Sequence, residues 1–189
     1  MKSAIADLAG TDAAARAAAA TEIYRAGCSL ADPVVRSWCA DAELASLFGA
    51  PNLQVTVGIA VSPATFSQAY VASGSPRLAE VPPEQDAQEF ELHFAGGVSL
   101  DVLTTRDPGG TGAIARFLTK FGEGIQQVEC RVTDVDRATQ ILTEKFGVQA
   151  VYPETRRGTD GTRVNFFLVP TTAGPKVLIE LYEQPMMAR

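Results

Sequence analysis

The chain has 189 residues, enough for one substantial hydrophobic core or for two small fused modules. Its 16 Lys and Arg against 22 Asp and Glu leave a formal net charge of −6, which argues against nucleic acid or an anionic membrane surface as a partner. Hydrophobic residues make up 46% and charged residues 20%, as in globular proteins, and no apolar run approaches the roughly 20 residues of a membrane span. Charged residues interrupt the first 20 positions, so we expect no secretory signal and predict a cytoplasmic protein.

Residues 1–50 differ from the rest of the chain in composition and hydrophobic spacing. Alanine is dominant at 13–20, and apolar residues then recur at helical spacings. We expect two or three helices, one of which starts with Asp32 as N-cap and Pro33 at the first helical position. The predicted domains are an N-terminal helical extension at 1–50 and a main domain at 51–189. The extension is expected to cover the main domain or to make an oligomer contact; the alternative is that it recruits a partner.

Short β-rich runs begin at residue 54 and occur in the same order twice. Modules 54–105 and 125–183 are each predicted to have the order βαβββ, with a helical linker at about 114–122. Strands are expected at 54–61, 89–94, 98–105, 125–132, 148–153, 163–170 and 177–183, and helices at 63–70 and 134–147. The fold class is therefore α+β, with two tandem modules after an N-terminal helical segment.

The duplication also indicates a site. Asp101 and Glu180 fall at equivalent positions of the two modules, each alone among apolar strand residues. Such a carboxylate costs desolvation energy unless it is paired, bound to a metal or lines a wet cavity. We therefore predict a cavity enclosed by a curved sheet; the alternative is a solvent-exposed edge strand.

Cysteine and histidine are scarce. Cys28, Cys39 and Cys130 are widely spaced without a CxxC pair, so all three are expected to be reduced and structural. His93 is the only histidine in the chain.

Several runs together resemble the methylmalonyl-CoA epimerases, members of the vicinal oxygen chelate superfamily that also contains glyoxalase I. In the second module the resemblance is carried by GEGIQQVECRVTDVDRA, RRGTDGTRVNFFLVP and VLIELYEQP. In the first module it is carried by VGIAV and VPPEQ, followed by the linker IARFLTKFGEG. The match spans about residues 54–185 and implies two paired βαβββ modules whose curved sheet encloses a divalent metal.

The resemblance implies metal ligands at Thr56, Asp101, Gln127 and Glu180. The epimerases have histidines at the first and third of these positions, so the ligand set in this chain contains only oxygen donors, with Gln127 binding through its carbonyl oxygen. Oxygen ligands favour a hard cation such as Mg²⁺ or Ca²⁺. The cofactor is thus a divalent metal or none.

The same resemblance implies that Glu180 and Glu89 remove and return the proton next to a thioester carbonyl. His93 follows Glu89 by four residues on the same strand face and is a candidate acid/base group or replacement ligand. The alternatives are a solvated hairpin face for Glu89 and a structurally satisfied His93.

Arg163 and Asn165 share a strand face in the second module, where they would suit a carboxylate or phosphate of the substrate. The alternative for this pair is a surface salt bridge. Gln127, Thr56 and Arg163 are candidate donors to an enolate if no metal binds.

Two functions follow from these residues. The first is a divergent, epimerase-like isomerase or lyase, weakly dependent on a metal or independent of one, that moves a proton next to a carbonyl or thioester. The second is a non-catalytic protein that binds or sequesters a small molecule. In both cases the expected partner is a small carboxylate or acyl-CoA-like molecule, and the expected assembly is a homodimer.

Overall fold

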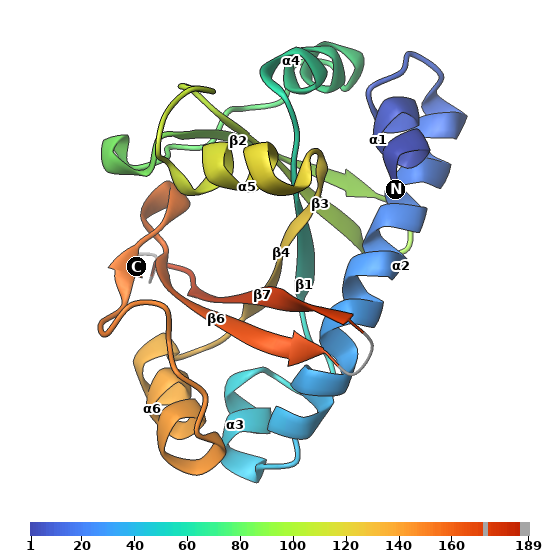
Figure 1. Ribbon diagram of the computed structural model, residues 1–189. Coiled ribbons are helices and arrows are strands. Elements are labelled where there is room, and N and C mark those ends of the chain that lie inside the picture. Colours follow the sequence, from blue (N-terminus) through green and yellow to red (C-terminus); the bar gives the residue numbers. More distant parts are fainter. Residues whose placement is uncertain (172–173, 186–189) are drawn as a thin grey trace. The chain divides into compact units, whose positions relative to one another are not determined.

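The computed structural model describes residues 1–171 and 174–185, and Figure 1 shows its ribbon. The α-helices are α1 (Lys2–Leu8), α2 (Ala13–Trp38), α3 (Ala42–Leu47), α4 (Pro63–Ala72), α5 (Ala113–Phe121) and α6 (Val135–Phe146). The strands are β1 (Val55–Ala60), β2 (Ala87–Phe94), β3 (Val98–Thr105), β4 (Gly124–Arg131), β5 (Arg156–Arg157), β6 (Arg163–Thr171) and β7 (Gly174–Glu183). Two short 3₁₀ turns lie at Pro83–Gln85 and Thr159–Gly161. The predicted α+β class, with an N-terminal helical segment and two successive modules, is confirmed.

The chain forms two compact units. Unit 1 combines Met1–Gly27 with Thr56–Gln126, and unit 2 combines Cys28–Val55 with the described chain from Gln127 onward. Each unit therefore contains one portion of the N-terminal helical segment together with one of the two β-rich modules. The domain limits at 1–50 and 51–189 stay a prediction.

Unit 1 has the strand order β2-β3-β1, in which β1 is parallel to β3 and β2 is antiparallel to it. Gly96 and Gly97, with φ of 77° and 76°, form the tight turn of the β2–β3 hairpin, a conformation that glycine adopts without strain. Helix α4 covers one sheet face, where the rings of Phe66 and Phe90 meet edge to face at 4.8 Å. This helix begins at Pro63 as predicted, and Ser62 caps it by accepting a hydrogen bond from the Thr65 amide.

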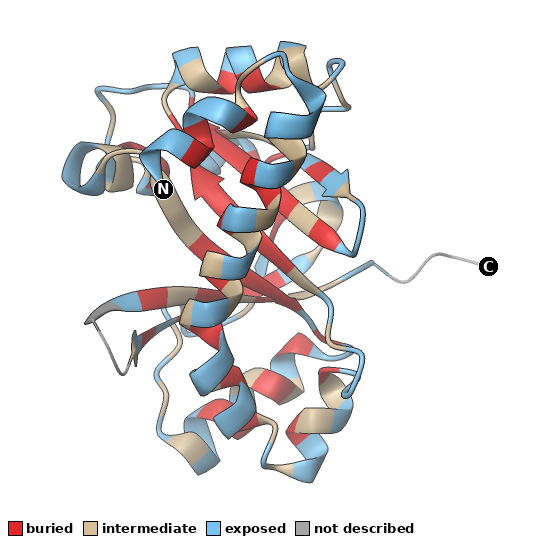
Figure 2. Ribbon diagram, turned by 90° about the vertical axis from the view of Figure 1, so that its right-hand side faces the viewer, coloured by how far each residue is buried: buried red, intermediate tan, exposed pale blue. Residues whose placement is uncertain are grey.

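Unit 2 has the strand order β4-β7-β6-β5, with β4 parallel to β7. Its core joins α6 to one face of this sheet and includes residues of the helical segment. Trp38 lies against both Phe48 and Phe167, with ring centroids 6.4 and 6.0 Å apart. Figure 2 shows buried residues along the strands and along one side of each helix. The core of unit 2 therefore includes residues from the C-terminal end of α2 and from α3.

Two predicted elements differ in the structure. Instead of a strand at 148–153, the chain makes one isolated bridge from Ala150 to Phe167 and a later two-residue strand, β5. In the first module, the described residues 73–86 contain no strand, so this module is βαββ. Three prolines in that stretch lack the backbone N–H that a strand ladder requires. A single backbone bond from Ala79 to Glu89 runs alongside β2 there.

The predicted helix start at Asp32 and Pro33 is wrong, because Pro33 lies inside α2. The helix continues through the proline, and Asp32 forms an ion pair with Arg36 one turn later at 2.7 Å instead of capping. Packing explains this override of local preference, since Ala31, Val35 and Trp38 are all buried in the core of unit 2.

The three cysteines are free, as predicted. Cys130 is fully buried on β4, and burial raises the pKa of its thiol well above the ordinary value, so it is a packing residue. None of the helices in the described part of the chain combines the length and apolarity needed to cross a membrane.

Gly27, in the middle of α2, is buried against Val57 of β1. A Cβ at Gly27 would lie 2.6 Å from both γ-methyl groups of Val57, closer than carbon atoms can approach. We predict that Gly27→Ala lowers the free energy of unfolding by about 1–3 kcal/mol, although alanine is the better helix former. Urea denaturation measures this change.

The matched control is a double-mutant cycle with Val57→Ala, which removes the two methyl groups. The two substitutions together should be less destabilising than the sum of their separate effects. Additive effects would contradict the close approach of Gly27 to Val57.

Candidate functional site

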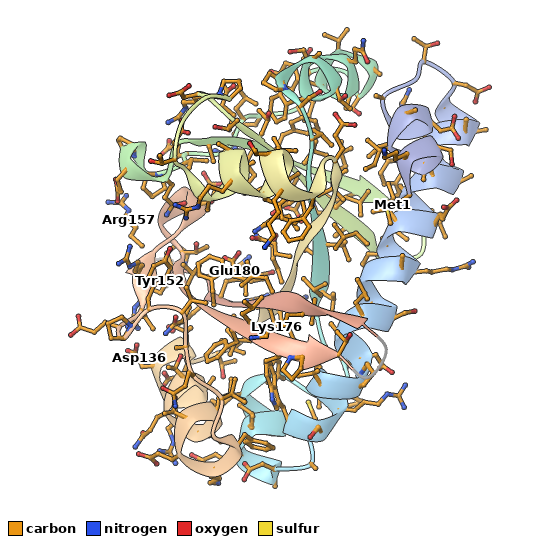
Figure 3. All side chains as sticks on the ribbon, viewed as in Figure 1. Met1, Asp136, Tyr152, Arg157, Lys176 and Glu180 are labelled. Atoms are coloured by element: carbon orange, nitrogen blue, oxygen red, sulfur yellow. The ribbon has the colours of Figure 1, made fainter. Side chains whose placement is uncertain are left out.

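Glu180 occupies the middle of β7 in unit 2. Its neighbours Ile179 and Leu181 are fully buried in the core with α6, so alternation along the strand turns Glu180 to the opposite face. Figure 3 labels Glu180 on the side of β7 away from α6. A partly buried carboxylate on this face is available for chemistry that a core residue could not perform.

The Gln127 side chain links Glu180 to a second carboxylate. Its amide nitrogen Nε2 donates to Glu180 Oε2 at 2.7 Å and to Glu129 Oε1 at 3.0 Å. Gln127 and Glu129 are both buried, each with about 7% of its surface exposed. The nitrogen must face the two carboxylates, because the amide oxygen at these distances would be repelled by them. The sequence-predicted residues Gln127 and Glu180 are thus brought together.

Glu129 was not among the predicted site residues. It lies two residues after Gln127 on β4 and directly opposite Glu180 in the parallel β4–β7 pair. Alternation places it beside Gln127 on one face, but the pairing of Glu129 with Glu180 depends on the register between two strands that are far apart in the sequence. Two carboxylates facing each other repel, and the hydrogen bonds of Gln127 offset that repulsion.

This arrangement bears on the metal implied by the resemblance. A divalent metal bound by Glu180 would require the oxygen of Gln127, not its nitrogen, on the same side. In residues 1–171 and 174–185, no group of three His, Cys, Asp or Glu side chains is placed to hold a metal ion. In its present orientation Gln127 offers no ligand oxygen beside Glu180, and no step of the chemistry proposed below passes through a metal.

Unit 1 presents a second polar face, opposite to the face covered by α4. Asp101 pairs with Gly58 of β1 and with Glu91 of β2, so alternation puts Thr56 and Glu89 on the same face as Asp101. Thr56 and Asp101 are buried, with 6% and 8% of their surfaces exposed. The structure therefore gathers the four predicted residues of unit 1 on one sheet face: Thr56, Glu89, His93 and Asp101.

Helix α5 covers one end of this polar face with apolar side chains. Leu103, the cross-strand partner of Glu89, forms a buried cluster with Ala60, Ala87 and Ile114. A carboxylate beside an apolar wall is typical of sites that bind small organic molecules.

His93 lies near the other end of β2, on the face it shares with Glu89. Its side chain is mainly exposed and contacts the exposed Glu91, with Nε2 and Oε2 3.4 Å apart. Its Nδ1 lies 3.0 Å from the hydroxyl of Ser99. These contacts tie His93 to the hairpin next to its turn, four residue pairs along the ladder from Glu89.

Arg163 and Asn165 share a strand face, as expected, but it is the face opposite to Glu180. The Arg163 guanidinium donates to Asp136 of α6 and lies 3.6 Å from Glu183. Asn165 is fully buried, and its amide donates to the Tyr152 carbonyl oxygen at 3.3 Å. The structure thus does not bring Arg163 or Asn165 together with Glu180.

A row of aromatic and cationic side chains crosses the Glu180 face of unit 2. Phe166 is the cross-strand partner of Glu180, and its ring meets that of Tyr152 edge to face at 6.0 Å. The guanidinium of Arg156 lies over the Tyr152 ring, 3.7 Å from its centre. Arg156 lies on β5, two strands from the strand of Glu180, so its positive charge lies on the same sheet at some distance from the carboxylate.

Comparison with solved structures shows the family. The methylmalonyl-CoA epimerase from Mycobacterium tuberculosis is 35% identical over 68% of this chain and 85% of that chain, with a TM-score of 0.55. A Streptomyces coelicolor methylmalonyl-CoA epimerase variant, in complex with 2-nitronate-propionyl-CoA, is 27% identical over 69% of this chain and 95% of that chain, with a TM-score of 0.54. A hypothetical protein from Bacillus halodurans C-125 is 28% identical over 73% of this chain and 99% of that chain, with a TM-score of 0.58.

No protein-family model and no curated protein matches the chain. On the identity and coverage of the Mycobacterium tuberculosis enzyme, the chain belongs to the methylmalonyl-CoA epimerase family of the vicinal oxygen chelate superfamily.

The ion pair of Arg163 leads to a prediction about stability. Hydrogen bonding to Arg163 lowers the pKa of Asp136 below its ordinary value of 3.8. Because the pKa is lower in the folded state, the pair stabilises the protein above the ordinary carboxyl range and loses this effect as the pH falls through the folded pKa. Arg163→Gln should therefore lower the free energy of unfolding at pH 7, by about 0.5 kcal/mol for so exposed a pair.

The difference between Arg163→Gln and wild type should shrink as the pH falls below about 4, because Asp136 of the unfolded chain takes up its proton before Asp136 of the folded protein does. Urea denaturation at pH 7 and pH 3 measures it. A difference that is equal at both pH values would contradict the ion pair as the cause.

Proposed function

We propose that this protein moves a proton at the carbon next to the thioester carbonyl of an acyl-CoA-like substrate, as an epimerase-like isomerase. The observation that carries the proposal is the placement of Glu180. It lies on the polar face of β7, and Gln127 holds one of its carboxylate oxygens at 2.7 Å. A carboxylate held in one orientation suits a general base, which must approach a C–H bond in a defined direction.

In the proposed reaction, a carboxylate oxygen takes the proton from the α-carbon as the C–H bond breaks. The electron pair moves onto the thioester oxygen to give an enolate. The second acid/base group then gives its proton to the α-carbon from the other side, which completes the inversion. The first group ends protonated and the second ends ionised.

We assign the two acid/base roles to Glu180 and Glu89, as the family resemblance implies. Each lies on the polar face of its own unit, and Glu89 is next to the apolar cluster beneath α5. Thr56 is the proposed hydrogen-bond donor to the enolate oxygen, because both hydrogens of the Gln127 amide are directed at Glu129 and Glu180. Neither assignment requires a metal ligand. The homodimer and the cytoplasmic location remain predictions from the sequence.

The row formed by Phe166, Tyr152 and Arg156 supports an anionic substrate longer than a simple carboxylic acid. An acyl-CoA carries its phosphates well away from the thioester carbon. Stacking on Tyr152 holds the Arg156 guanidinium in place, and arginine pairs with phosphate oxygens through two parallel hydrogen bonds. We therefore propose that Arg156 contacts a phosphate of the substrate.

The acid/base assignment predicts that Glu180→Gln and Glu89→Gln each slow α-proton exchange by about 10²–10⁴-fold. Glutamine keeps the shape of glutamate but cannot accept the proton. The measurement is the incorporation of deuterium from D₂O into methylmalonyl-CoA, which NMR monitors over time. Glu154→Gln and Glu22→Gln, which change exposed carboxylates of unit 2 and unit 1, are the matched controls and should exchange at the wild-type rate.

Wild-type exchange in both variants would contradict the roles of Glu180 and Glu89. If wild type catalyses no exchange but binds methylmalonyl-CoA in a thermal-shift measurement, the alternative of a non-catalytic binding protein would replace the proposed function.

The proposed phosphate contact predicts a change in KM. Arg156→Ala should raise KM for the acyl-CoA substrate by about tenfold, as expected for the loss of one charge-assisted hydrogen-bond pair, and leave kcat within about twofold. Arg36→Ala, at an exposed arginine of unit 2 that pairs with Asp32, is the control and should leave both constants unchanged. An unchanged KM in Arg156→Ala would contradict the contact.

A further inference from the structure

We propose that Glu129 is a positioning residue for Glu180 and acts through the amide of Gln127. This inference rests on the proposed role of Glu180, but the contacts that carry it are present in unit 2 without any substrate. Neither the sequence patterns nor the family resemblance singled out Glu129.

Burial gives the first reason. The side chain of Glu129 is only 7% exposed, and a buried carboxylate is unfavourable unless hydrogen bonds compensate the loss of water. Gln127 Nε2 supplies one such bond to Glu129 Oε1 at 3.0 Å. Conversely, this bond holds the Gln127 amide on the Glu129 side.

The shape of the amide gives the second reason. A side-chain amide has two hydrogens on one nitrogen, both in the plane of the group. With one hydrogen directed at Glu129, the other is directed at Glu180, where it meets Oε2 at 2.7 Å. The terminal torsion of glutamine is otherwise broad, so Gln127 alone would not be held in this orientation.

The strand register makes the arrangement rigid. Glu129 and Glu180 are directly paired on the parallel strands β4 and β7, and the flanking pairs, Val128 with Ile179 and Cys130 with Leu181, are fully buried. The backbone positions of all three polar residues are therefore set by the core. Glu129 thus determines which end of the Gln127 amide meets the base, and thereby the orientation of the Glu180 carboxylate.

The test compares Glu129→Ala, which removes the hydrogen-bond acceptor, with Glu129→Gln, which keeps an acceptor oxygen but no charge. The first measurement is the rate of hydrogen exchange at the Gln127 side-chain amide. It is monitored by ¹⁵N–¹H NMR of the full-length protein without substrate. In wild type we expect two resolved and protected hydrogens, in contrast to the exposed Gln68, which serves as the internal reference.

Glu129→Ala should abolish the protection of one Gln127 hydrogen, and Glu129→Gln should retain most of it. In the deuterium-exchange assay, Glu129→Ala should lower kcat about tenfold and leave KM within about twofold, whereas Glu129→Gln should recover most of the loss. Glu154→Ala, at an exposed carboxylate of the same unit, is the control and should change neither readout.

Two results would overturn the inference. One is a wild-type Gln127 amide that exchanges as fast as that of Gln68, a measurement that requires no variant to fold. The other is a folded Glu129→Ala protein with an unchanged Gln127 amide and an unchanged kcat. A wild type with protected Gln127 hydrogens but no catalysed exchange of the substrate proton would instead contradict the proposed function alone.

Discussion

The parallel pairing of β4 with β7 is the constraint on which unit 2 depends. One register sends Val128, Cys130, Ile179 and Leu181 into the core with α6 and places Glu129 beside Glu180 on the other face. A shift by one residue would exchange the two faces and bury both carboxylates in an apolar core. The burial of the apolar residues therefore positions the polar ones, and the chemistry of the site is tied to the stability of the unit.

The two units repeat this register with different side chains. In unit 1 the parallel β1–β3 pair aligns Gly58 with Asp101, and in unit 2 the β4–β7 pair aligns Glu129 with Glu180. The carboxylate of the last strand is thus common to both units. Its partner on the parallel strand is Gly58 in unit 1 and Glu129 in unit 2, and Asp101 is also paired with Glu91 of β2. In unit 2 the amide of Gln127 lies between the two carboxylates. The two polar faces are therefore chemically unequal, as two acid/base groups with different tasks would require.

Prediction from the sequence succeeded where local patterns and burial agree and failed where packing decided. The strand predicted at 98–105 matches β3 over its full length, and the helix predicted from residue 63 matches the start of α4. Pro33 was misread because core packing carries α2 through a residue that favours a helix start. Arg163 and Asn165 were correctly placed together, yet their face depends on the pairing of β6 with β7, which no local pattern contains.

The sequence by itself determined the α+β class, the repeated order of elements and the carboxylates Asp101 and Glu180. Period-2 alternation, turn residues and a lone charge in an apolar strand are local patterns. They can be recognised in the sequence without knowledge of the tertiary contacts. Only the tertiary structure decided that Glu129 faces Glu180, that the Gln127 amide nitrogen lies between them, and that Gly27 is needed against Val57. Those contacts join residues up to 53 positions apart. Their geometry is set by strand register and core packing, which a one-dimensional pattern does not specify.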